Sequence, residues 1–435
     1  MQVSVENVGK LERKLTVRLP AESLQTQVAT RLRELGRTVR LAGFRPGKVP
    51  PKVIEQRFGA QVRSEALGEV IREGFSAAVQ QEKLRPAVAP SIEATETGEG
   101  GEVAFTATFE VMPEIGNIDV SSLKIVRPVS AVEDADVERM IETLRLQRRT
   151  WTPVERAAQA GDMVMFESRG SAGDLRIPAE GVERSGTIIG SGAILPAIEE
   201  KLQGLAADAE AEFEVEFPAD YRVEALAGKP VQMHVRVVRV SEAELPELDA
   251  EFVQSFGVAA GDIETFHREV RANLDRELKG ALMARLKTEV VEKLLAAHAE
   301  LDLPARMIDN EAQALARQAE QEAEQRGQKG AKVDPAVFAD AARRRVAAAL
   351  LLGELARQND IRLDSARLLE TLNMIASTYE EPQEVIELYR REPQLMQGLQ
   401  SRVIEDQVID WIAEHSDLSE QTLPFQDVMR PMTGG

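Results

Sequence analysis

The longest regular pattern along the chain is a series of eight apolar residues spaced four apart in its second half. Four residues turn an α-helix through about 400°, so the apolar stripe rotates by roughly 40° at each step. We therefore predict one helix over residues 262–299, roughly 57 Å long, which must meet different partners along its length. The eight residues are Phe266, Val270, Leu274, Leu278, Leu282, Leu286, Val290 and Leu294.

The rest of the second half also has helical periodicity. Residues 305–326 and 335–358 are predicted to form a helical hairpin, because Asp334 is a favourable N-cap and a proline follows it in the first turn. The tail after Leu423 is expected to fray, as chain termini commonly do. Further helices are predicted to begin near Asp364, Pro382 and Pro393.

Strand and helix patterns alternate in residues 1–112. Residues 2–19 largely keep a period of two on either side of Gly9, which predicts a β-hairpin. Two helical segments follow, separated by a Gly/Pro-rich loop, and residues 103–111 then alternate as a half-buried strand. We expect an α+β domain that ends near residue 112.

A linker and a smaller α+β domain are predicted in the middle of the chain. Residues 113–149 are the expected linker, with one helix that starts at Asp134 or Asp136. The domain is expected to span residues 150–245, and everything over 246–435 is expected to be helical. The predicted elements of the domain at 150–245 are a strand at 163–166, a helix at 196–202 and strands at 211–217 and 231–240.

The composition excludes several kinds of site. The chain has no cysteine, so disulfides, thiolate chemistry and Cys-ligated metals are excluded, and its four histidines are scattered singly. No histidine has a second ligand at the spacing of a zinc helix, so no metal is expected. The start lacks the basic and apolar regions of a signal peptide, and no apolar run is as long as a membrane span. We expect a cytosolic protein with no membrane partner.

Two short strings have the spacing of catalytic motifs but lack their partners. The stretch from Ser121 to Lys124 matches S-x-x-K without the S-D-N and K-T-G motifs that complete that site. The stretch from Gly190 to Gly192 lacks the third glycine of a nucleotide-binding loop. No nucleophile, base and orienting group can be assembled, so we predict no acid/base catalytic residue and no cofactor.

Charge is distributed unevenly along the chain. The formal net charge is −20, yet residues 1–60 contain twelve Lys/Arg and five Asp/Glu. A basic end on an acidic chain favours docking to a polyanion such as RNA through that end, whereas the overall charge argues against DNA. The alternative is the solvated outer face of a helix that carries Arg31, Arg33, Arg37 and Arg40.

The Gly/Pro-rich loop between the first two helices places an aromatic residue beside two cations. Glycines in such a loop supply positive φ, prolines stiffen it, and a phenyl ring held in water favours a partner that covers it. The alternative is a tight turn whose ring folds back onto its own helices. The residues are Gly43, Phe44, Arg45, Gly47, Lys48 and Pro50.

This loop and the segments around it resemble the bacterial trigger factor family along the whole chain. In that family the loop reads Gly-Phe-Arg, a basic residue, then Gly-Lys/x-x-Pro, and here Pro46 stands where a lysine is often seen. A second segment, 217–221 followed by 226–229, resembles the isomerase domain of the family. Residues 244–248 resemble its exit into the C-terminal domain.

The resemblance implies a fold class and a set of partners. The implied fold is multidomain α+β and all-α, with a ribosome-docking domain, an FKBP-like domain and an elongated helical domain with arms. The implied partners are the large ribosomal subunit near the exit tunnel, both protein and RNA, and unfolded or nascent polypeptides. The resemblance also allows a homodimer off the ribosome.

The resemblance implies a prolyl isomerase pocket in residues 150–245. FKBP-like pockets have aromatic walls around the proline, and three aligned positions here hold Ser168, Ile198 and Met233 instead. Reduced isomerase activity is therefore expected. The residues that the resemblance places in the pocket are Ser168, Ile194, Leu195, Ile198, Tyr221 and Met233.

The leading interpretation is an ATP-independent chaperone that docks on ribosomes, stays partly ribosome-bound in the cytoplasm and holds nascent chains for folding or export. One alternative is an enzyme whose main task is prolyl isomerisation on folding proteins. Another is a helical scaffold with an RNA-binding end. Co-sedimentation with ribosomes separates the first from the second, and binding to naked RNA favours the third.

Overall fold

The computed structural model describes residues 1–431 except 42–43, 45–48, 98–101, 174, 179, 220–226, 259, 329, 331 and 380. The chain divides into two compact units. The first unit comprises residues 1–129 and 282–422, and the second comprises residues 130–281 and 423–435. In the part of the chain that the structure describes, no helix is long and apolar enough to cross a membrane.

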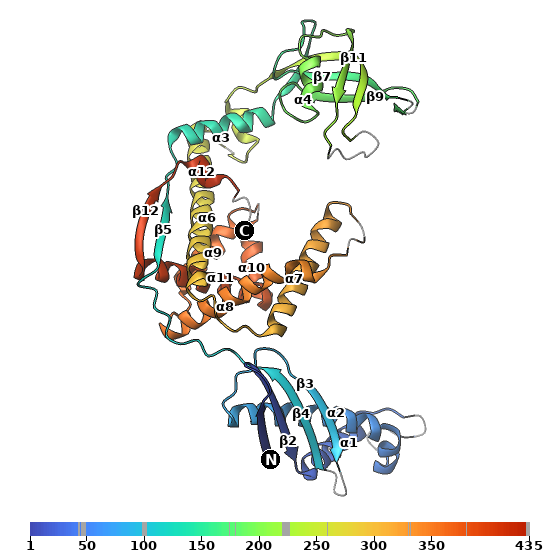
Figure 1. Cartoon of the computed structure of the whole chain (residues 1–435), viewed down its shortest axis with the longest axis vertical. Helices are drawn as coiled ribbons and strands as arrows, with labels where there is room; N and C mark the ends of the chain where they lie inside the picture. The colour runs from blue at the N-terminus through green and yellow to red at the C-terminus, as the bar shows by residue number, and fades with distance from the viewer. Residues whose placement is uncertain are drawn as a thin grey trace. The chain divides into compact units, whose positions relative to one another are not determined.

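The first unit begins with a four-stranded antiparallel sheet in the order β1-β2-β4-β3 (Figure 1). Helices α1 and α2 pack on one face of this sheet and share its hydrophobic core. The hairpin, the two helices and the strand predicted at 103–111 are confirmed. The elements are β1 (Gln2–Asn7), β2 (Glu12–Leu19), α1 (Ala21–Thr38), α2 (Pro51–Gln81), β3 (Ser91–Thr97) and β4 (Glu102–Glu110).

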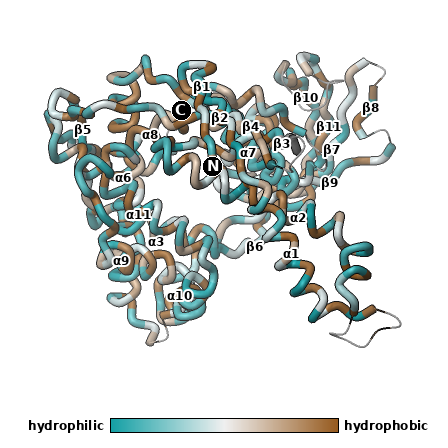
Figure 2. The backbone as a smooth tube through the Cα atoms, turned by 90° about the horizontal axis from the view of Figure 1, so that it is seen from below, coloured by the Kyte–Doolittle hydropathy of each residue, from teal (hydrophilic) through white to brown (hydrophobic). Residues whose placement is uncertain are grey.

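Close packing fixes the helix pair on the sheet. Leu15, Val17 and Phe105 point from β2 and β4 into the core and are fully buried. Gly74 of α2 lies so close to the sheet that an added Cβ would come within 2.8 Å of Leu19 Cδ1. Figure 2 shows hydrophobic and hydrophilic positions alternating along α1, as in an amphipathic helix. The sheet therefore holds both helices, and with them the two ends of the loop that joins them.

The remainder of the first unit is mainly helical. The helical hairpin is confirmed, and the Asp334 carboxylate accepts a hydrogen bond from the Ala336 amide at 3.0 Å. The predicted starts at Asp364, Pro382 and Pro393 are also confirmed. The elements are α7 (Ala305–Gln325), η1 (Pro335–Phe338), α8 (Ala339–Gln358), α9 (Ser365–Ala376), α10 (Pro382–Arg391) and α11 (Pro393–His415).

Two features at the end of the chain differ from the sequence prediction. Strand β12 (Asp417–Thr422) pairs in parallel with β5 (Lys124–Val129), a strand pair that the polar residues of β12 do not indicate. The tail after Leu423 was predicted to fray; this is wrong for residues 424–431, and residues 432–435 lie outside the described residues. Pro424 caps the short helix α12 (Phe425–Met429), whose Val428 is buried, and this burial stabilises the tail against fraying.

The second unit contains a six-stranded sheet and one short helix on it. The sheet runs β10-β11-β7-β8, with β6 paired to β11 and β9 paired to β7. The strands near 211–217 and 231–240, the helix at 196–202 and the helix starting at Asp134 are confirmed. The elements are α3 (Asp134–Gln147), β6 (Thr150–Val154), β7 (Met163–Ala172), β8 (Leu175–Ile177), β9 (Glu183–Ile188), α4 (Pro196–Leu202), β10 (Glu210–Glu216), β11 (Pro230–Glu244) and α5 (Ala250–Gln254).

Strand β7 extends well beyond the predicted end at residue 166. Its inward positions continue with Ser168 and Gly170, which are buried although neither is a large apolar residue. The period-two pattern therefore stops at Phe166 in the sequence while the backbone pairing continues to β8 and β9. The extra strands build one side of the pocket described below.

Helix α6 (Ile263–Ala297) confirms the predicted long helix and its change of partners. At its start Phe266 packs against the rings of Phe252 and Phe256, with centroids 6.1 and 5.6 Å apart. Further along, Val290 and Leu294 lie in the core of the helical region, together with buried residues of α8 and α11. The rotation of the apolar stripe along α6 thus agrees with a helix whose residues belong to both units.

Candidate functional site

The loop between α1 and α2 carries the first candidate site. Phe44 is 40% exposed, and its amide donates a hydrogen bond to the Leu41 carbonyl at 3.1 Å. Val49 is buried where the chain returns to the core, and Pro50 caps α2. The Phe44 ring is thus held at the surface between two anchored ends. Gly43, Arg45, Gly47 and Lys48 lie outside the described residues.

The arginines of α1, together with Arg40, which the sequence placed on this helix but which follows its end at Thr38, fall into two groups. Arg31 is half-buried and pairs with Glu65 at 3.3 Å and with Glu69, so it ties α1 to α2. Arg33, Arg37 and Arg40 are exposed. Only Arg31 is therefore committed to the fold of this pair of helices, and the exposed arginines leave positive charge at the surface near the loop.

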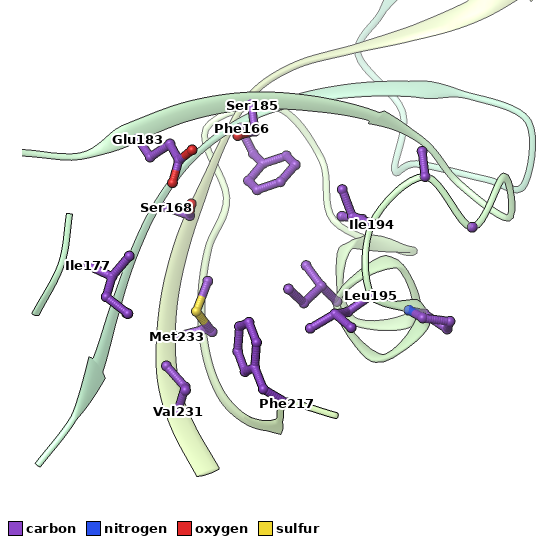
Figure 3. A pocket seen from close by; sticks show the side chains of 15 residues that line it. Phe166, Ser168, Ile177, Glu183, Ser185, Ile194, Leu195, Phe217, Val231 and Met233 are labelled. Carbon is purple, nitrogen blue, oxygen red and sulfur yellow. The ribbon is translucent and has the colours of Figure 1, made fainter. Parts of the chain in front are cut away.

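The second candidate site is a cavity of about 530 Å³ in the second unit (Figure 3). Five of the six residues that the sequence places in an isomerase pocket line it, and Tyr221 lies outside the described residues. Figure 3 shows Ile194 and Leu195 facing Met233 across the cavity. The five residues are Ser168, Ile194, Leu195, Ile198 and Met233.

Two aromatic residues of this cavity were missed at the sequence level. Phe166 at the inner face of β7 and Phe217 after β10 both line the cavity and are buried. Both stand at the ends of predicted strands, 163–166 and 211–217, where alternation alone does not tell a pocket wall from a core. The cavity is therefore more aromatic than the predicted residues alone suggest.

Few of the side chains that line the cavity are polar. Among the described residues that line it, Glu183 at the edge is the only charged one. Ser168 is buried and faces the cavity, and Ser185 contributes a second hydroxyl group to the cavity lining. Within the described part of the chain no cluster of three or more His, Asp or Glu could hold a metal ion. The arrangement suits an apolar ring with little polar recognition.

An ion-pair cluster anchors the backbone at the start of β7. Arg156 donates to both oxygens of buried Asp162, at 2.5 and 3.0 Å, and to Glu242 at 3.0 Å. Hydrogen bonds from Arg156, against the opposing effect of burial, lower the pKa of the Asp162 carboxyl. Asp162 and Ile189 also bond through their backbones at 3.0 Å. This network fixes the start of the loop that leads to Ile194.

Comparison with known proteins covers the whole chain. A family model described as bacterial trigger factor protein matches residues 1–144, and a model of the C-terminus of that protein matches residues 262–414. The trigger factor of Xanthomonas euvesicatoria pv. vesicatoria (strain 85-10) is 54% identical over 433 residues, 99% of this chain and 100% of that protein. The trigger factor of Stenotrophomonas maltophilia (strain R551-3) is 52% identical with the same coverage.

A solved structure of the trigger factor chaperone, studied for promiscuous substrate recognition in folding and assembly, is also similar. It covers 95% of this chain and 99% of its own, with 18% identity and a TM-score of 0.42. A score this low carries no argument about the present chain. The two family models and the sequence relatives decide the family.

Proposed function

Because the chain belongs to the bacterial trigger factor family, a family of ribosome-associated chaperones, we propose that its first 112 residues dock it at the ribosomal exit site. The observation that carries this proposal is the exposed Phe44 ring on the loop between α1 and α2. A ring held in water gains free energy when a partner covers it. The basic character of residues 1–60 adds attraction to ribosomal RNA.

In this proposal the other segments of the chain have separate roles. Residues 113–149 link the docking domain to an FKBP-like domain at 150–245, and residues 246–435 hold unfolded or nascent chain without ATP. The partners are the large subunit near the exit tunnel and the emerging polypeptides. The protein acts in the cytoplasm, partly bound to ribosomes.

The cavity in the second unit supports prolyl isomerisation, which needs no acid or base. The barrier of about 18–20 kcal/mol is the loss of amide resonance in the twisted state. An apolar pocket that excludes water favours the less dipolar twisted amide over the planar one, and this differential stabilisation is the catalytic effect. Phe166 and Phe217 supply flat surfaces for the proline ring.

We expect the isomerase activity to be weak. Ser168, Ile198 and Met233 give the cavity narrow or flexible side chains where flat aromatic walls would grip the ring and exclude water. Replacing Ile198→Phe together with Ser168→Phe should raise the rate, whereas Tyr221→Ala should change it little. The measurement is the rate of cis-trans exchange of a prolyl peptide with the full-length chain, beside an aromatic-walled relative.

The outcome of this assay separates two accounts of the pocket. A wild-type rate within about threefold of the relative would refute the weakened-pocket account. The alternative function, an enzyme mainly devoted to prolyl isomerisation, predicts such a high rate together with no co-sedimentation with ribosomes. Unchanged thermal unfolding of the double variant is the control that its added rings are accommodated.

A further inference from the structure

A buried carboxylate lies directly behind the wall of the cavity. Glu199 of α4 is 4% exposed, and none of the ion pairs among the described residues includes it. Burying an unpaired carboxylate is costly unless hydrogen bonds replace its water. Glu199 must therefore be satisfied by neutral donors around it.

Five donors surround this carboxylate. The Thr187 hydroxyl donates to Oε1 at 3.0 Å, and the Gly190 and Gly192 amides donate to Oε2 at 2.9 and 3.2 Å. The Ser191 hydroxyl donates to Oε1 at 3.3 Å, and the Ile194 amide donates as well. Three of the five donors are thus backbone amides of a single loop.

The backbone of that loop is shaped to face the carboxylate. Gly190 and Gly192 have φ of +86° and +69°, the left-handed region that residues with a side chain rarely adopt. Left-handed residues in a loop turn successive N–H groups toward one point, which makes an anion-binding concavity. Here the anion is a side chain of the protein itself.

The charge of Glu199 strengthens these bonds. Burial alone would raise the pKa of its carboxyl, but the hydrogen bonds from Gly192, Thr187, Gly190 and Ile194 outweigh burial and hold the pKa below its usual value. The group is therefore ionised at neutral pH. Hydrogen bonds to an ionised acceptor are roughly twice as strong as those between neutral groups.

The same loop forms one wall of the isomerase cavity. Gly192, Ala193, Ile194 and Leu195 line the cavity, whereas Glu199 does not. The amides held by the carboxylate therefore fix the loop backbone that carries Ala193, Ile194 and Leu195. Without the Glu199 carboxylate, the loop could adopt many other conformations, because its two left-handed glycines restrict the backbone little.

We infer that Glu199 is a positioning residue for the isomerase pocket, and that its carboxylate holds the loop from Gly190 to Leu195 in the shape that grips a prolyl ring. This inference rests on the proposed isomerase function. A pocket whose competent shape is populated only part of the time binds more weakly by that fraction. Glu199 therefore acts on substrate binding, because substrate that is already bound selects the competent loop.

The test is Glu199→Gln in the full-length chain. Glutamine keeps the size of the side chain but removes the charge and turns an NH₂ group toward amides that also donate. We expect KM for a prolyl peptide to rise about tenfold while kcat stays within about twofold of wild type. Glu200→Gln is the matched control, because Glu200 is the exposed neighbour on the same helix.

Two kinetic outcomes would overturn the inference. A KM within twofold of wild type would show that the loop keeps its shape without the carboxylate. A fall in kcat at unchanged KM would show that the substitution only reduces the amount of folded pocket. The assay is exchange spectroscopy by NMR, which follows the cis and trans peptide signals directly.

A readout independent of catalysis keeps this test separate from the proposed function. Hydrogen exchange at the Gly190, Gly192 and Ile194 amides should be at least tenfold faster in Glu199→Gln and unchanged in Glu200→Gln. If the wild-type chain catalyses no exchange at all, the proposed isomerase function fails. The amide rates, with the dissociation constant of the prolyl peptide, still decide whether Glu199 holds the loop.

A second pair of variants covers the case in which Glu199→Gln does not fold. Thr187→Val removes one donor to the carboxylate at nearly constant volume, and Thr187→Ser keeps the hydroxyl. We expect KM to rise about threefold in the valine variant and to stay at the wild-type value in the serine variant. Equal KM values in both variants would overturn the inference.

Discussion

Replacing Phe44, Arg45 and Lys48 together by alanine is expected to abolish co-sedimentation of the chain with ribosomes. Burial of a phenyl ring in a partner contributes about 1.5–3 kcal/mol, and the two cations add their attraction to phosphate. A loss of about 3 kcal/mol or more lowers affinity by more than about a hundredfold. The measurement is the fraction of protein in the ribosome pellet.

A matched control removes the same side-chain types elsewhere. Tyr379, Arg390 and Arg391 are an exposed aromatic residue and two exposed arginines of the helical region. Their triple replacement by alanine should leave ribosome binding unchanged. Pelleting of the Phe44 variant at the wild-type level would show that the loop is not the docking site. Wild-type binding should also weaken as salt rises, because cations released from RNA drive the association.

Loss of exposed apolar side chains from the helical region should largely remove the holding of unfolded chains. Leu369, Tyr379, Leu388 and Leu395 are exposed and come from a stretch that includes α9, α10 and the start of α11, helices that contact one another. If each contributes about 0.5–1 kcal/mol to contact with a client, replacing all four by serine weakens holding at least about twentyfold. The measurement is light scattering of a protein that aggregates during refolding.

Two controls locate the holding surface. Serine at four exposed apolar positions outside the helical region should leave aggregation suppression unchanged, and these positions are Val8, Leu146, Leu175 and Val238. A chain in which a short Gly/Ser linker replaces residues 150–245 should also suppress aggregation at near-normal levels. Loss of suppression in that deletion, with the rest folded, would assign client holding to the isomerase domain instead.

The helical elements could be predicted from the sequence because their signals are local. The stripe of α6 and the cap at Asp334 depend on residues within a few positions, and both agree with the structure. Strands β8 and β12 could not be predicted in this way. The three residues of β8 become a strand because β7, directly before them, offers backbone partners, and the polar β12 becomes one because it pairs with β5, which lies far away along the chain.

The pocket illustrates the same limit. Resemblance to a family supplied Ile194, Leu195 and Met233, which line one cavity in the structure. Phe166 has the same alternating pattern as any core strand residue, so periodicity cannot tell a pocket wall from a core. Glu199 carries no sequence signal at all, since its role depends on the positive φ of two glycines and on burial.

The most direct test of ribosome docking places a photoreactive phenylalanine analogue at position 44. The chain is irradiated on ribosomes that carry a nascent polypeptide, and the products are identified by mass spectrometry. If the loop between α1 and α2 docks at the exit site, the analogue at position 44 should crosslink to large-subunit components beside the tunnel. The same analogue at Val8, exposed in the same domain, should give no such product. Equal crosslinking from both positions, or none from position 44, would contradict docking through this loop.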